Sequence, residues 1–171
     1  MSASPRYLGL NDFVEEVSKA LLRAPLKERY ESHDLLVQDV VQAVERSLKE
    51  LLGASQVSYH VWQGVAEAGG QGIAPVEAFG NTFVADLVVD VAGKPTLALV
   101  VEMVEAPQEA PQKVSSALGE AFIQAHQYPA VLLLFYSPSG AVRVQDLLDR
   151  ELSMDLWSLH KVRLVARWGR G

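Results

Sequence analysis

The chain has 171 residues, of which 49% are hydrophobic and 21% are charged, and its formal net charge is −6. This length and apolar content predict a single folded domain over residues 1–171 and exclude a disordered chain. The absence of cysteine excludes disulfides, thiolate catalysis and cysteine-based zinc sites, and the acidic net charge argues against strong generic binding of polyanions.

No stretch of the sequence is apolar for long enough to cross a bilayer, so no membrane partner is expected. The N-terminal residues MSASPRYLGLND lack the basic start and the apolar block of a signal peptide. A cytoplasmic location is therefore expected. The charge is uneven, because the last twelve residues, HKVRLVARWGRG, contain Lys161 and three arginines but no acid.

The N-terminal third of the chain is predicted to be helical after a loose arm at residues 1–10. A helix is expected over residues 12–22, where apolar residues recur at helical spacing, and Pro25 interrupts the pattern. A second helix, over residues 32–52, carries a long apolar stripe and is followed by Gly53, a residue typical of helix C-caps.

The middle of the chain is predicted to contain three strands. Residues 56–65 alternate and are rich in β-forming residues, whereas residues 66–81 are rich in glycine and are expected to form a long loop. Residues 82–92 and 96–104 are nearly continuous apolar runs, as expected for strands covered on both faces, and a tight turn joins them.

The last third is predicted to alternate between helix and strand. Helices are expected over residues 112–127 and 144–157, and strands over residues 130–136 and 162–168. Three successive strands followed by a helical crossover to a further strand predict an α/β fold, with a mixed central sheet flanked by helices on both faces.

Each of the two central strands carries a carboxylate among apolar residues, Asp86 in the first and Glu102 in the second. Burial of an unpaired carboxylate is costly, so such groups are usually paired, hydrogen-bonded or bound to a cation. Because side chains alternate between the faces of a strand, the two acids share a face only if the residue numbers paired across the hairpin have an even sum. Ala92 paired with Thr96 across a three-residue turn meets this condition, and we predict it; Ala92 paired with Pro95 does not, unless a bulge intervenes.

With these acids the chain resembles the restriction-endonuclease-like superfamily, the PD-(D/E)xK nucleases. The similarity covers residues 32–137. It includes the strands ADLVV (85–89) and LVVEMV (99–104), the helix end QAHQYP (124–129) and the strand AVLLLFYS (130–137). It implies a restriction-endonuclease-like core of order αβββαβ, here with an extra N-terminal helix and a C-terminal helix and strand.

The resemblance also implies a site. Asp86 and Glu102 would ligate Mg²⁺ or Mn²⁺, hard cations that prefer oxygen ligands, and Glu45 on the second helix would be an accessory ligand. The family's lysine two residues after the glutamate is replaced by Val104, and the proline before the aspartate by Ala85. Lys113, at the start of the following helix, is the best substitute for the missing lysine.

Two functions follow from the resemblance. One is metal-dependent hydrolysis of phosphodiester bonds in DNA, or in RNA, with Asp86, Glu102 and Lys113 as catalytic residues. The other is a catalytically inactive domain of the same fold that serves binding or dimerisation, which the missing lysine and the acidic net charge favour. A nucleic-acid partner, and a homodimer formed through the exposed last strand, are the expected partners.

The simpler interpretations are that Asp86 and Glu102 are solvated or locally paired at strand ends, and that Asp90 is a solvated strand end. Gln124 and Tyr128 fit a QxxxY pattern of one nuclease branch, but packing of Tyr128 on the sheet is the preferred interpretation. The histidines show no zinc-site spacing.

Overall fold

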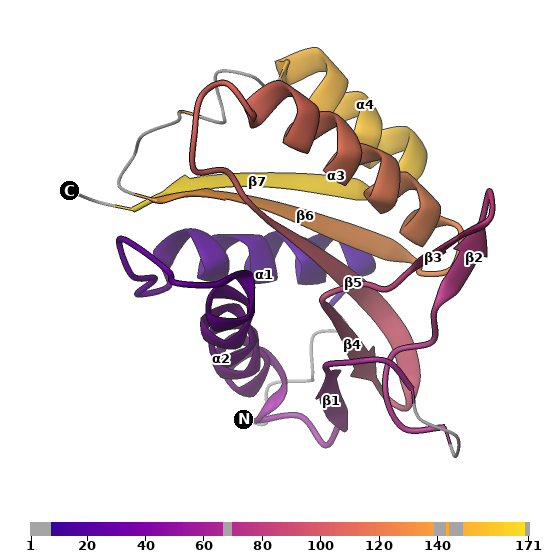
Figure 1. Cartoon of the computed structure of the whole chain (residues 1–171). Coiled ribbons are helices and arrows are strands. Elements are labelled where there is room, and N and C mark those ends of the chain that lie inside the picture. Colours follow the sequence, from indigo (N-terminus) through magenta and orange to yellow (C-terminus); the bar gives the residue numbers. More distant parts are fainter. Residues whose placement is uncertain (1–7, 67–69, 139–142, 144–148, 170–171) are drawn as a thin grey trace.

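The computed structural model describes residues 8–66, 70–138, 143 and 149–169 of the chain (Figure 1). Its helices are α1 (Leu10–Arg23), α2 (His33–Leu52), α3 (Ala110–Ala125) and α4 (Arg150–His160). Its strands are β1 (Tyr59–Trp62), β2 (Val76–Ala78), β3 (Asn81–Phe83), β4 (Leu87–Val91), β5 (Lys94–Met103), β6 (Ala130–Ser137) and β7 (Val162–Trp168).

In the described part of the chain, five strands form one mixed sheet in the order β1-β4-β5-β6-β7. The first three strands of this order are antiparallel, whereas β6 runs parallel to β5 and β7 parallel to β6. Because α3 connects β5 to β6 and α4 precedes β7, each parallel pair is joined through a helix. The predicted α/β architecture with a mixed, helix-flanked sheet is confirmed.

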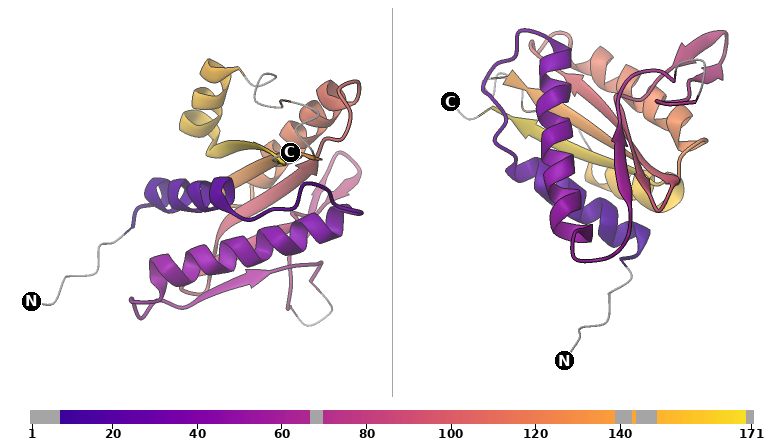
Figure 2. Two further views of the ribbon diagram at one scale, coloured as in Figure 1. Left: turned by 90° about the vertical axis from the view of Figure 1, so that its left-hand side faces the viewer. Right: turned by 90° about the horizontal axis from the view of Figure 1, so that it is seen from below.

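The sheet lies between two helical layers, with α1 and α2 on one face and α3 and α4 on the other (Figures 1 and 2). Two apolar clusters fill the spaces between the layers. The cluster on the α1–α2 side takes alternate residues of the central strands, for example Leu87, Leu99 and Leu132. The cluster on the α3 side takes the residues between them, such as Val88 and Ala98, which is why both central strands are apolar almost throughout.

Two predicted elements around residue 80 differ in the structure. The predicted loop at residues 66–81 contains β2 and part of β3, a short hairpin that packs against α3. The predicted strand at residues 82–92 is divided into β3 and β4 by residues 84–86. Of the predicted arm, residues 1–7 lie outside the described residues and Leu10 already begins α1; of the predicted helix at 144–157, residues 144–148 lie outside them.

The β4–β5 hairpin has a two-residue turn, not the predicted three-residue turn. Val91 pairs with Lys94, and both turn residues, Ala92 and Gly93, have positive φ, which is the signature of a type I′ turn. A bulge then shifts the register between Asp90, which pairs with Pro95, and the next pair toward the site, Val89 with Leu97. Beyond the bulge the paired numbers have an even sum, so the predicted even register is present, although a bulge produces it.

No helix within the described ranges combines the length and the apolar character needed to cross a membrane.

Candidate functional site

Asp86 lies immediately before β4, beside the middle of β5. Its backbone N–H donates to Leu99 O at 3.0 Å, which continues the β4–β5 ladder by one residue. In this register Asp86 lies opposite Val100, and alternation along β5 puts Glu102 on the same face as Val100. Both carboxylates therefore lie on the face of the sheet that α3 covers, which was the condition set for a shared site.

The carboxylate of Asp86 caps the exposed end of this ladder. Strand β5 continues past the start of β4, and the N–H of Val101 donates to Asp86 Oδ2 at 2.6 Å. The carbonyl oxygen of Val101 lies 2.8 Å from His33 Nε2, at the start of α2. Because a carbonyl oxygen can only accept, His33 Nε2 must carry the proton. The same nitrogen is 3.5 Å from Asp86 Oδ1, so Val101, Asp86 and His33 are interlocked.

Glu102 forms an ion pair with Lys113, the residue predicted from the sequence as the substitute for the missing lysine. Lys113 Nζ lies 3.7 Å from Glu102 Oε1 and donates to Met103 O at 2.7 Å. It also lies 3.4 Å from Oε1 of Glu109, the N-cap residue of α3. Met103 O belongs to the peptide that precedes Val104, so the ammonium of Lys113 lies beside the position at which PD-(D/E)xK nucleases have their motif lysine.

Glu120 on α3 is a third carboxylate near this site, and the sequence analysis missed it. It lies two turns after Lys113 on α3 and is half-buried. Its pKa is raised to about 7, mainly by burial and then by the negative charges of Asp86 and Glu102, while the charge of His33 opposes the rise. The sequence contains a signal for it, because Glu120 falls on the inward stripe of α3 beside Ala117 and Ala121.

Burial is also the main reason why the pKa values of the other two carboxyls are raised. It raises the pKa of Asp86, opposed by the Val101 N–H and by His33. It also raises the pKa of Glu102, opposed by the positive charge of Lys113. The side chains of Asp86 and Glu102 are only 21% and 28% exposed. A half-buried group of acids whose charged forms are all disfavoured attracts cations.

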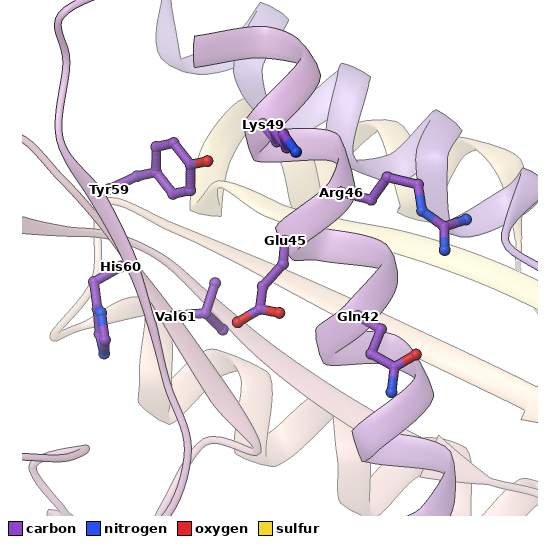
Figure 3. A pocket seen from close by; sticks show the side chains of 7 residues that line it. All are labelled: Gln42, Glu45, Arg46, Lys49, Tyr59, His60 and Val61. Carbon is purple, nitrogen blue, oxygen red and sulfur yellow. The ribbon is translucent and has the colours of Figure 1, made fainter. Parts of the chain in front are cut away.

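Glu45 is not brought to these acids. It lies twelve residues after His33 on α2, a rise of about 18 Å along the helix axis. Its side chain points toward β1 and lines a shallow, open pocket between α2 and that strand (Figure 3). The other lining residues are Gln42, Arg46, Lys49, Tyr59, His60 and Val61. The structure thus gives no support to Glu45 as an accessory ligand of the Asp86 site.

The structure shows the contacts of two other residues considered in the sequence analysis, Asp90 and Tyr128. Asp90 is on the α3 face, nearer the turn, where its Oδ2 accepts from Trp62 Nε1 at 2.9 Å, so it is partnered and not simply solvated. Tyr128 is buried in the α3-side cluster, which confirms the preferred interpretation that it packs on the sheet.

The donor chemistry of the site fits a hard divalent cation. Asp86 and Glu102 supply carboxylate oxygens on one face of the sheet, and burial raises the pKa of both, so a bound cation would favour their charged forms. Within the described ranges, no three His, Asp or Glu side chains are close enough together to hold an ion. Mg²⁺, however, is commonly held by one or two carboxylates and completes its shell with water and substrate phosphate oxygens.

Comparison of the chain with protein-family models, with curated proteins and with solved structures found no match. The case for a function therefore rests on the residues of the site.

Proposed function

We propose that the chain is a metal-dependent phosphodiester hydrolase with a restriction-endonuclease-like core, acting on DNA or RNA at the site of Asp86, Glu102 and Lys113. One observation carries the proposal: two half-buried acids, one immediately before β4 and one on β5, share a face of the sheet, and Lys113 reaches the second of them from α3. Together they offer the two carboxylates and the ammonium group of the PD-(D/E)xK motif. Here the ammonium group belongs to a lysine on α3 and not to a lysine two residues after the glutamate.

Asp86 and Glu102 would hold the cation, Mg²⁺ or Mn²⁺. When bound, such a cation polarises the phosphate and lowers the pKa of the attacking water. Lys113 contributes a fixed positive charge where negative charge develops on the phosphate oxygens. Its hydrogen bond to Met103 O holds the ammonium in place, so little reorganisation is needed during the reaction.

His33 acts in this proposal as a positioning residue. By donating to Val101 O and lying against Asp86 Oδ1, it fixes the strand and the carboxylate relative to each other. Because Oδ2 of Asp86 accepts a hydrogen bond from the Val101 N–H, Oδ1 of Asp86 is the oxygen that would bind the metal cation.

A specific observation favours a second candidate, a non-catalytic domain of the same fold. The contacts of Asp86 with Val101 and His33 complete the sheet ladder, and Lys113 is shared between Met103 O, Glu102 and Glu109. All of these contacts also serve stability. In this candidate the acids are retained for the fold, and the domain binds a partner without cleaving it.

Cleavage assays separate the two candidates. Labelled single-stranded and duplex DNA, and single-stranded RNA, are incubated with the protein and Mn²⁺ or Mg²⁺. The hydrolase predicts cleavage that Asp86→Asn and Glu102→Gln each reduce by at least about 100-fold. The amide at position 86 still accepts from the Val101 N–H, so the fold is retained.

Glu45→Gln is the matched control, because it removes a carboxylate from the same protein at a place remote from the site. It is expected to leave cleavage unchanged. Absence of cleavage by the wild-type protein on all substrates, together with no change in melting temperature up to millimolar Mn²⁺, would refute the hydrolase in favour of the non-catalytic domain.

A further inference from the structure

Phe79 is the most exposed large apolar residue of the described chain. It lies at the tip of the β2–β3 hairpin, and 93% of it is accessible to solvent. Ala78 pairs with Asn81, so Phe79 and Gly80 form a two-residue turn. Both have positive φ, 52° at Phe79 and 74° at Gly80, which identifies another type I′ turn.

A phenylalanine is an unfavourable choice for this position. The first residue of a type I′ turn is usually asparagine, aspartate or glycine, because bulky side chains rarely adopt positive φ. A ring that is 93% exposed gains almost no packing that could offset this conformational cost. The β4–β5 hairpin has the same turn with Ala92 in the corresponding place. A strained, exposed aromatic residue at a hairpin tip therefore requires a reason outside the folded chain itself.

The hairpin is connected to the candidate site through the chain itself. It packs against α3 and stands beside the C-terminal end of that helix, whereas Lys113 lies in its first turn (Figure 1). Strand β3 leads through Val84 and Ala85 directly to Asp86. Phe79 and Asp86 are seven positions apart in the sequence, so the two are at most about 25 Å apart, a distance that a few nucleotides of a single strand span.

We propose that Phe79 stacks on an unpaired nucleobase of a nucleic acid strand whose backbone lies at Asp86, Glu102 and Lys113. This inference rests on the proposed function, and it adds single-stranded or locally unpaired DNA or RNA as the substrate. Every base offers a flat π-face to an aromatic ring, so such stacking is independent of sequence.

The charge of the protein favours the base over the phosphate as the group that Phe79 contacts. With a net charge of −6 the chain gains little affinity from the phosphate backbone. The strands next to the tip bear Glu77, which accepts from Thr82 Oγ1 and adds a negative charge. Stacking supplies binding energy without requiring positive charge, and its contribution depends little on salt.

The test compares three variants by fluorescence anisotropy. The probes are fluorescein-labelled 12-residue DNA and RNA single strands and a blunt DNA duplex, with Ca²⁺ as the cation and a gel to verify that the strands stay intact. Phe79→Asn removes the ring and favours the turn. It is expected to weaken single-strand binding by about 5- to 150-fold, and to raise the melting temperature, so that the loss is not due to unfolding.

Two variants serve as controls. Phe79→Trp retains an aromatic ring and is expected to bind as tightly as the wild type, with quenching of its fluorescence when a base stacks on it. Ala92→Asn relieves the same conformational strain in the turn of the β4–β5 hairpin, away from the site. It is expected to raise the melting temperature without changing the affinity for the single strands. The difference between the DNA and RNA probes shows which strand is preferred.

Unchanged single-strand affinity in Phe79→Asn overturns the proposal. So does a loss of self-association in Phe79→Asn with unchanged affinity, which would assign the tip to contact with a second copy of the chain. Cleavage by the wild type with Mn²⁺ tests the proposed function separately. Cleavage with normal binding by Phe79→Asn rejects only the stacking, whereas weaker binding by Phe79→Asn without any cleavage by the wild type supports stacking and rejects the hydrolase.

Discussion

Val101 has both of its backbone polar groups satisfied by side chains from elsewhere in the chain. Its N–H donates to Asp86 and its C=O accepts from His33. A buried backbone group without a partner is costly, so these two side chains stabilise the end of β5 whatever else they do. Substitutions at position 86 must therefore retain an acceptor if they are to report on chemistry and not on folding.

At Lys113, replacement by methionine keeps most of the apolar stem and removes the charge. If the ammonium stabilises negative charge on the phosphate, Lys113→Met lowers the cleavage rate by about 100- to 1,000-fold. Lys94→Met, at the exposed start of β5 and far from the acids, removes an equal charge and leaves the rate unchanged. Equal rates for both variants would contradict the assignment.

Val104 cannot simply be replaced by the lysine that PD-(D/E)xK nucleases have at this place in their motif. Its side chain is completely buried in the α3-side cluster, and its N–H donates to Tyr136 O. We expect Val104→Lys to lower the free energy of unfolding by about 3 kcal/mol, as measured by urea denaturation. A change of less than about 0.5 kcal/mol would mean instead that the new ammonium reaches Glu102.

The acids of the site could be predicted from the sequence, because carboxylates within apolar strands are chemically anomalous. Lys113 was predicted as the substitute cation because it begins the helix that follows β5. Its place beside Glu102 agrees with that prediction, while its catalytic role stays a prediction. The contact of His33 with Asp86 could not be predicted, because it depends on how α2 docks across the sheet.

Helix α3 carries the acid whose protonation should affect stability most. Glu120 has a folded-state pKa of about 7, above its ordinary value of 4.5. Below pH 4.5 the carboxyl is protonated whether the chain is folded or unfolded, and its contribution to stability is complete. Between these two values the unfolded chain releases the proton while the folded chain keeps it, so stability falls as the pH rises from 4.5 through about 7 and then levels off.

Glu120→Gln should remove this loss. At pH 8.5 the variant is expected to be more stable than the wild type by about 1–3 kcal/mol, and the difference should disappear at pH 4. The raised pKa values of Asp86 and Glu102 leave a smaller slope of the same sign in the variant. Urea denaturation across this pH range measures the difference.

Glu109, the N-cap residue of the same helix, provides the opposite control. Hydrogen bonds from the N–H groups of Glu105 and Ala106 lower its pKa. Its contribution to stability is therefore present above the ordinary pKa and lost as the pH falls. Glu109→Gln should not be stabilised at pH 8.5, and a gain equal to that of Glu120→Gln would show that the effect reflects the net charge of the protein alone.

The helices and central strands were predictable as elements because long apolar stripes and runs dominate them. The β2–β3 hairpin was missed because each strand has only three residues and its turn has phenylalanine where asparagine is usual. The sequence contains a signal for the bulge in the β4–β5 hairpin, namely Pro95. Pro95 lacks an N–H, and a proline inside a sheet is typical of bulges and edge strands.

At the scale of the whole molecule, binding of a cation should be visible as thermal stabilisation. A ligand at one hundred times its dissociation constant stabilises the folded state by about 2.7 kcal/mol. For a domain of this length that corresponds to a rise in melting temperature of roughly 5–11 °C. Mn²⁺ should produce this rise in the wild type and in Glu45→Gln, but not in Asp86→Asn; an equal rise in all three proteins would place the ion elsewhere.

The predicted homodimer through β7 stays a prediction. Within the described residues β7 pairs only with β6, so its outer edge is a possible pairing surface. In a symmetric antiparallel pair centred on Val165, Arg163 would lie opposite Arg167 of the second copy. Like charges directly opposite each other destabilise a strand pair, so any dimer through this edge must use another register.

The bulge in the β4–β5 hairpin determines where this hairpin can lose a residue without separating the two acids. Thr96 is the residue without a partner, between Pro95 opposite Asp90 and Leu97 opposite Val89. Deleting Thr96 would straighten the hairpin and keep Asp86 and Glu102 on one face, because the residues on either side of it retain their orientation. Deleting a paired residue between the bulge and Glu102 would turn the two acids to opposite faces. Among related lineages, length variation in this hairpin should therefore be confined to Thr96 wherever both acids are retained.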